Sequence, residues 1–210
     1  MPSPPPDVLR LLLASCALLL LAACQTAAVS PAPVESRLPR AALVDGECTE
    51  YGAVAARLDH GVVAYVKQDA DYLWLCVDLP DESYATGEFV LDAPALAVPL
   101  VLHVSGQLGE WPLGNEALRP KEPDSDLWWN VRGWTAIAAR FNGTEEGGEQ
   151  LRFLRASGQE FQFDKRRFGP GPWTIRGDFW SVNDGEGGRV RVALDDGSGE
   201  GFALPAGRPR

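Results

Sequence analysis

The sequence predicts an all-β fold, an antiparallel two-sheet β-sandwich that follows a signal peptide and a disordered tether. Short segments rich in aromatic and β-branched residues recur after residue 44, and Gly, Asn, Asp and Pro cluster between them. No stretch in this part of the sequence shows a sustained helical period with capping residues. The densest segment, residues 71–79, is apolar on both alternating faces and contains no Gly or Pro. We therefore expect it in the middle of a sheet, covered on both faces.

The N-terminus has the pattern of an export signal. Residues 11–22 are apolar but fewer than the roughly 20 residues that cross a bilayer, and they match the core of a signal peptide. Small residues then precede Cys24, which resembles the lipobox of bacterial lipoproteins. The resemblance implies removal of residues 1–23 and acylation of Cys24, with palmitate among the chains that anchor it. An ordinary secretory signal with an incidental Cys is the alternative.

The residues after Cys24 indicate a destination and a tether. By resemblance to the sorting rules of Gram-negative bacteria, Gln25 favours a lipid anchor in the outer membrane, and it leaves open whether the protein faces the periplasm or the cell surface. Residues 24–43 contain Pro31, Pro33 and Pro39 among small and charged residues, which is typical of a flexible linker. Residues 44–210 are enough for one domain with a real core.

The chain is acidic, with a formal net charge of −10. Loss of the signal peptide removes one acidic and one basic residue, so the charge does not change. An acidic protein is a poor candidate for the phosphate backbone, and we expect no nucleic-acid partner. The basic cluster Lys165-Arg166-Arg167 is too small to reverse this expectation, and we interpret it as a solvated turn.

Two cysteines remain in the mature domain, because Cys16 leaves with the signal peptide and Cys24 carries the lipid. Cys48 and Cys76 form an even pair in an exported chain, where oxidation is permitted, so we expect a disulfide. Two buried free thiols are the alternative. There is no Cys-x-x-Cys pair and no His near either residue, which argues against zinc, and we expect no metal ligands.

The strands are expected between clusters of turn-forming residues. The hairpin of residues 61–68 and 71–79 turns at Asp69-Ala70-Asp71, and Pro99 indicates an edge or a bulge in its strand. The remaining expected strands are residues 89–92, 97–105, 127–131, 134–141, 150–156, 160–163, 173–180, 189–194 and 201–204.

Three short motifs carry a family resemblance. They are Asp45-Gly46-Glu47 leading to Tyr51, then Leu73-Trp74-Leu75 in the hairpin, and finally Gly133-Trp134-Thr135 followed by Glu160-Phe161-Gln162-Phe163. Together they resemble the family 9 carbohydrate-binding modules over most of residues 44–182. Tyr51 stands where that family usually has Trp, and Phe163-Asp164 stands where it usually has Ile-Pro. The resemblance implies a β-sandwich and, more weakly, a carbohydrate ligand.

Seven Trp residues make this domain rich in the side chain that stacks on sugar rings. We expect Trp74, Trp134 and Trp173 in the core. The candidate ligand-binding residues are Trp111, in a loop flanked by Gly and Pro, Trp128 and Trp129, adjacent on an expected strand and so on opposite faces, and Trp180, at a strand end. Packing is the alternative role for each. Candidate polar partners, chosen by proximity in sequence, are Glu110, Asn115, Asn130 and Arg132.

Other chemistries have weaker support. Carboxylates in Gly-rich loops suit Ca²⁺, so a calcium site is an open alternative for Asp184, Glu186, Asp195, Asp196 and Glu200, but no calcium-loop spacing is present and we expect no cofactor. The two His residues, His60 and His103, lie far apart, and there is no Gly-x-Ser-x-Gly motif. The only Met is Met1, so a Met-ligated haem has no ligand in the mature chain.

These observations favour a non-catalytic envelope lipoprotein, held at the membrane by its lipid, that binds carbohydrate or glycan through exposed Trp. The alternative is an interaction or assembly lipoprotein that docks onto another envelope protein.

Overall fold

The computed structural model describes residues 41–84, 86–144 and 151–206, and for residues 138–144 and 151–157 it describes only the backbone. The chain divides into two units, Met1–Leu38 and Pro39–Arg210, and all described residues belong to the second. The predicted signal peptide, Cys24 and the linker as far as residue 40 lie outside the described residues. No described helix has the length and apolar character needed to cross a bilayer.

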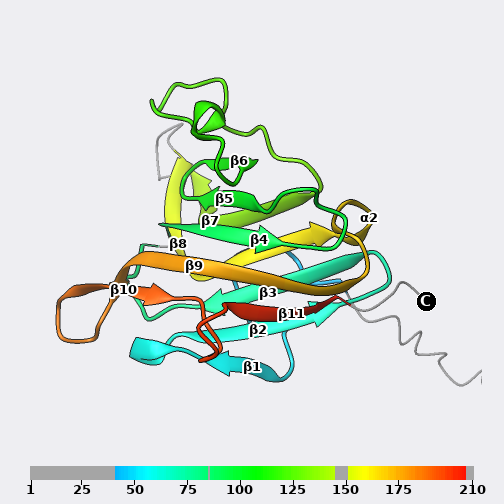
Figure 1. Cartoon of the computed structure of the whole chain (residues 1–210). Helices are drawn as coiled ribbons and strands as arrows, with labels where there is room; N and C mark the ends of the chain where they lie inside the picture. The colour runs from blue at the N-terminus through cyan, green and yellow to red at the C-terminus, as the bar shows by residue number, and fades with distance from the viewer. Residues whose placement is uncertain (1–40, 85, 145–150, 207–210) are drawn as a thin grey trace, which may run out of the picture. The chain divides into compact units, whose positions relative to one another are not determined.

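The described chain forms two antiparallel sheets, as the sequence predicts (Figure 1). One sheet has the order β1-β2-β3-β8-β7, with β1 (Val54–Arg57), β2 (Val63–Gln68), β3 (Tyr72–Asp78), β8 (Leu151–Asp164) and β7 (Trp134–Thr144). The other has the order β10-β9-β4-β5-β6, with β10 (Arg189–Ala193), β9 (Gly171–Asn183), β4 (Thr86–Asp92), β5 (Leu100–Val104) and β6 (Leu108–Pro112). The strand β11 (Phe202–Ala206) pairs with the first part of β9. Three short helical turns complete the described elements: η2 (Asp59–Gly61), η3 (Glu116–Leu118) and α2 (Lys165–Phe168).

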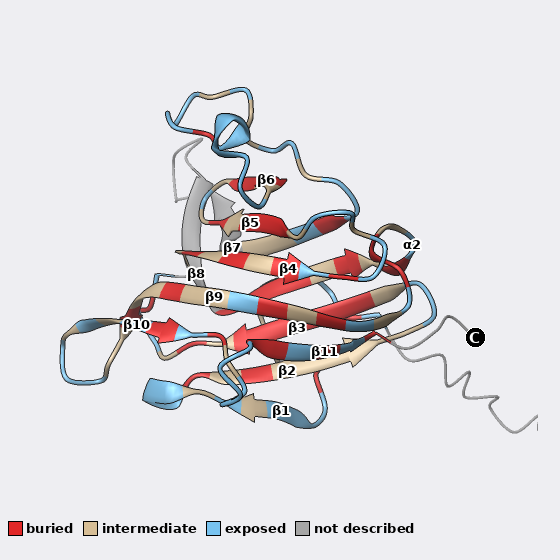
Figure 2. Ribbon diagram, in the orientation of Figure 1, coloured by how far each residue is buried: buried red, intermediate tan, exposed pale blue. Residues whose placement is uncertain are grey.

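The main core lies between the two sheets and is rich in aromatic rings. Phe89 on β4 meets Phe161 on β8 edge to face at 5.6 Å between ring centroids, which joins the sheets. Phe163 and Trp173 extend this contact, again edge to face, at 6.0 Å. Figure 2 shows the consequence as alternating buried and less buried residues along β4 and β9, whose second face points away from the core.

The strand β3 is buried on both faces, as expected from its sequence (Figure 2). Leu73, Leu75 and Val77 face the main core. On the opposite face, Trp74 and Cys76 form a second apolar cluster with Ala42 and Tyr51, so the segment that enters the domain provides the missing cover.

The predicted disulfide joins this segment to the sheet: Cys48 and Cys76 are bonded, with their Cα atoms 5.7 Å apart. Gly158 leaves room for the bond, since a Cβ atom there would lie 2.7 Å from the Cys48 sulfur. Beside it, Glu160 is fully buried and accepts hydrogen bonds from the Tyr51 hydroxyl at 2.7 Å and from the backbone amides of Asp45 and Gly46. The Gly158 amide also donates to the Gly46 carbonyl at 2.9 Å, so the entering segment is attached by a covalent bond and by a set of hydrogen bonds.

The predicted hairpin is confirmed as β2 and β3, but several expected boundaries are wrong. Residue 150 lies outside the described residues, and the rest of the two expected segments, 151–156 and 160–163, forms one long strand, β8; β1 and β6 were not expected. Pro99 precedes β5 rather than interrupting it. Residues 127–131 form no strand, because turns run from Ser125 onward and the amide of Trp129 donates to the Leu108 carbonyl at 2.7 Å.

The basic cluster is only in part a solvated turn. Lys165 is buried, and its ammonium donates to the Gln68 side chain at 2.7 Å and the Asp69 carbonyl at 2.6 Å. Arg167 pairs with Glu110 of β6. Only Arg166 projects into solvent, so two of the three basic residues stabilise the fold.

Candidate functional site

The outer face of the six-stranded sheet carries a groove of about 520 Å³. It lies over the strands β4, β5, β6 and β9, with side chains from β10 and from the connection after β6 at its margins. This is the face turned away from the aromatic core, so its side chains are not needed for packing between the sheets. The side chains that line it include Val90, Val101, Trp111, Arg119, Arg176 and Trp180.

The sheet register explains why these residues meet. Arg176 pairs with Val90, Val90 with Val101, and Val101 with Trp111, so one row runs across four strands on the outer face. Val90 and Val101 form an apolar floor between a charged residue at one end and an aromatic residue at the other. Adjacent strands lie about 4.8 Å apart, so the row spans roughly 14 Å, long enough for a short oligosaccharide.

Arginine and tryptophan form pairs on opposite sides of this floor. The Arg119 guanidinium lies over the Trp111 ring at 5.6 Å, and the Arg191 guanidinium lies over the Trp180 ring at 5.3 Å. Trp111 is only 2% exposed, whereas Trp180 is partly exposed. The Trp180 indole nitrogen is buried and has no hydrogen-bond partner within the described part of the chain.

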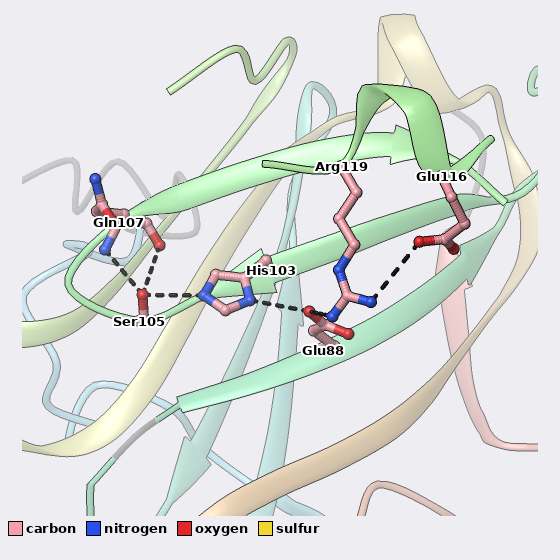
Figure 3. Close-up of polar contacts among 6 residues, drawn as sticks. All are labelled: Glu88, His103, Ser105, Gln107, Glu116 and Arg119. Carbon is pink, nitrogen blue, oxygen red and sulfur yellow. Dashed lines mark hydrogen bonds and ion pairs between the residues drawn. The ribbon is translucent and has the colours of Figure 1, made fainter. Parts of the chain in front are cut away.

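A chain of polar contacts joins Glu88, Arg119 and Glu116, which line the groove, to His103 and the turn after β5 (Figure 3). Glu88 accepts from Arg119 at 2.9 Å and lies 3.3 Å from His103 Nδ1. Its hydrogen bond with His103 and the charge of Arg119 together lower the pKa of Glu88, against the opposing effect of burial. Arg119 also lies 3.7 Å from Glu116, so it is shared between two carboxylates.

The same network places a hydroxyl, an imidazole and a carboxylate in the order of a hydrolytic triad, because His103 Nε2 lies 3.0 Å from Ser105 Oγ. Three contacts work against that chemistry. The Ser105 hydroxyl is held in the turn by the backbone of Gln107, the His103 ring packs against Trp128 at 4.9 Å, and Glu88 is shared with Arg119. These groups hold the β5–β6 hairpin and position Arg119.

The four predicted ligand-binding Trp residues do not form one site. Trp111 and Trp180 line the groove, and Trp111 does so from β6 rather than from a loop. Trp128 and Trp129 do not line it. Trp128 lies over Gly109, where a Cβ atom would be 3.0 Å from its ring, and Trp129 is 61% exposed in a left-handed backbone conformation (φ 64°).

Glu110, chosen as a polar ligand partner, has a structural role instead. It makes two hydrogen bonds with Arg167, at 2.6 and 2.7 Å, and accepts from the Trp134 indole at 2.6 Å. These contacts tie the β6 edge to the other sheet. Asn115, Asn130 and Arg132 lie on the connection between β6 and β7, outside the groove.

The acidic loops use their carboxylates for their own turns. Asp184 accepts from the amides of Glu186 and Gly188, and Asp195 accepts from those of Gly197 and Gly199. Across residues 41–84, 86–144 and 151–206, no group of three or more His, Cys, Asp or Glu side chains is placed to hold a metal ion.

The sequence did not point to the charged residues of the groove, which are Glu88, Glu116, Arg119, Arg176, Asp178 and Arg191. One signal was present: within β9, Arg176, Asp178 and Trp180 alternate with Ile175, Gly177 and Phe179, which is the period-two pattern of a strand with one polar face.

No family model matches this chain, and no curated protein or solved structure matches it either. The resemblance to family 9 carbohydrate-binding modules therefore remains a prediction based on the quoted motifs.

Proposed function

We propose that this protein is a non-catalytic lipoprotein, anchored in the outer membrane through Cys24, that binds carbohydrate in the groove over β4, β5, β6 and β9. The observation that carries the proposal is the composition of the groove: an apolar floor of Val90 and Val101 between Arg–Trp pairs. Sugars present C–H faces that pack on apolar and aromatic surfaces, and hydroxyls that accept from guanidinium N–H groups. The volume is in the range of small-ligand sites.

The proposal predicts that binding depends on Trp180 and not on Trp129. Isothermal titration of the mature domain against cello-, xylo- and chito-oligosaccharides, oligogalacturonate and peptidoglycan fragments identifies a ligand. Trp180→Ala then weakens its binding by about 10-fold, since it removes one wall of the groove and with it an aromatic contact worth about 1.5 kcal/mol.

The matched control is Trp129→Ala, which removes a more exposed Trp from outside the groove and leaves affinity unchanged. Thermal unfolding of both variants checks that they are folded. Absence of binding to every member of the panel overturns the proposal, and equal losses in the two variants overturn the assignment to the groove.

A protein-docking role is the second candidate, because the connection between β6 and β7 carries three large apolar side chains that are exposed. Leu113, Leu118 and Trp129 are 41%, 44% and 61% exposed. Exposed apolar patches mark sites of protein association. Capture of one stoichiometric envelope protein by the wild type, but not by Trp129→Ala, favours this role.

A further inference from the structure

We infer that the groove takes a saccharide bearing a carboxylate, and that Arg176 binds this carboxylate; the inference rests on the proposed function and specifies its ligand.

Most of the charged side chains that line the groove are paired with one another. Its lining contains three guanidinium groups and three carboxylates. Arg119 lies against Glu88 and Glu116, and Arg191 lies 3.7 Å from Asp178. Among the described residues Arg176 has no ion pair and no hydrogen bond, so it is the guanidinium of the groove that has no carboxylate partner there.

Arg176 lies on the outer face of β9, at one end of the apolar floor. It is opposite Val90 on the neighbouring strand, and Val101 is opposite Val90 on the next strand. A sugar ring over these two valines would therefore place a ring substituent within reach of the guanidinium. Gly201 lies close to the backbone of β9 at this point, since a Cβ atom there would be 2.8 Å from Arg176 Cβ.

The guanidinium of Arg176 matches a carboxylate in shape and charge. A guanidinium is planar, always charged, and presents paired N–H donors that match the two oxygens of a carboxylate. A uronic acid combines such a carboxylate with an apolar ring face. The rest of the protein opposes this ligand, because its net charge is −10, so anion binding here depends on the local arginines rather than on the overall field.

The test compares oligogalacturonate with its methyl ester, which has the same rings without the charge. The wild type binds the free acid about 10-fold or more tightly than the ester, the range expected for hydrogen bonds to charged groups, and added salt reduces the difference. Arg176→Gln abolishes the preference, and Arg176→Lys, which keeps the charge but not the paired donors, retains part of it. Arg132→Gln, at an exposed arginine outside the groove, keeps the full preference.

The outcomes separate this inference from the proposed function. Equal binding of acid and ester by the wild type overturns the inference and leaves carbohydrate binding intact. A preference that survives in Arg176→Gln overturns the role of Arg176. No binding of the acid, the ester or any other member of the glycan panel overturns the proposed function together with the inference.

Discussion

At the scale of single residues, the burial of Glu160 changes its own pKa and that of Tyr51. It is a fully buried carboxyl on β8, opposite Cys76 in the sheet, and it accepts bonds from the hydroxyl and the amides that bring in the N-terminal segment. Burial raises the pKa of Glu160, and the three hydrogen bonds oppose that effect without cancelling it. Burial and the contact with Glu160 also raise the pKa of Tyr51 far above its ordinary value, so Tyr51 stays a donor at any physiological pH.

The raised pKa of Glu160 predicts a pH dependence of stability. The folded state holds this proton to a higher pH than the unfolded chain does, so the stabilisation is complete below about pH 4.5 and is lost as the pH rises through the folded pKa. The free energy of unfolding of the wild type, relative to Glu160→Gln, should therefore fall between pH 4 and pH 7.

Urea titrations at a series of pH values measure this difference. Glu186→Gln, at an exposed carboxyl in the loop before β10, controls for general charge effects. A difference that rises with pH would show that the hydrogen bonds outweigh burial at Glu160.

At the scale of elements, the segment from Ala42 to Tyr51 behaves as a cover for β3. It has no strand of its own among its residues, yet it buries Trp74 and Cys76 and is held by the disulfide. The sequence predicted β3 and the Cys pair because both depend on local composition. It did not predict the cover, because contacts such as Glu160 with Asp45 join residues 115 positions apart.

Removal of the disulfide should therefore weaken the whole described fold. The bond closes a sequence separation of 28 residues, which corresponds to about 3–4 kcal/mol in the chain-entropy model. The double variant Cys48→Ala/Cys76→Ala should lose about this much free energy of unfolding in urea titrations. Reduction of the wild type removes the same bond without a substitution. A loss of free energy of unfolding under about 1 kcal/mol in both experiments would contradict a stabilising role of the disulfide.

The strand β6 also depends on contacts between residues that are far apart in the sequence. Glu110 was selected because it lies next to Trp111, but in the structure it faces Arg167, 57 positions away, and the Trp134 indole. Likewise, Trp111 looked like a loop residue because Gly and Pro flank it, whereas β5 provides a partner strand whose pairing overrides those local signals. Proximity in sequence therefore pointed to the strand that carries Trp111, but it did not identify the residues that Glu110 and Trp111 contact.

At the scale of the whole molecule, the outer faces of the two sheets differ. The five-stranded sheet packs its outer face against the entering segment, while the six-stranded sheet keeps a groove on its outer face. The fold class, the central hairpin and most strands could be predicted, because hydrophobic alternation and turn residues are local signals. The groove could not, because its composition depends on the order β9-β4-β5-β6, which brings residues 88–91, 100–104, 108–112 and 174–180 side by side.

The central claim, that the groove is the ligand site, is tested most directly by following the seven Trp indole N–H signals in ¹H–¹⁵N spectra during titration with the tightest ligand of the glycan panel. Single Trp→Phe variants assign the signals. We predict that the Trp180 and Trp111 signals shift in proportion to saturation while the Trp129 signal stays in place. Shifts confined to Trp128 and Trp129, with Trp111 and Trp180 unchanged at saturation, would contradict the account and place the ligand on the connection between β6 and β7.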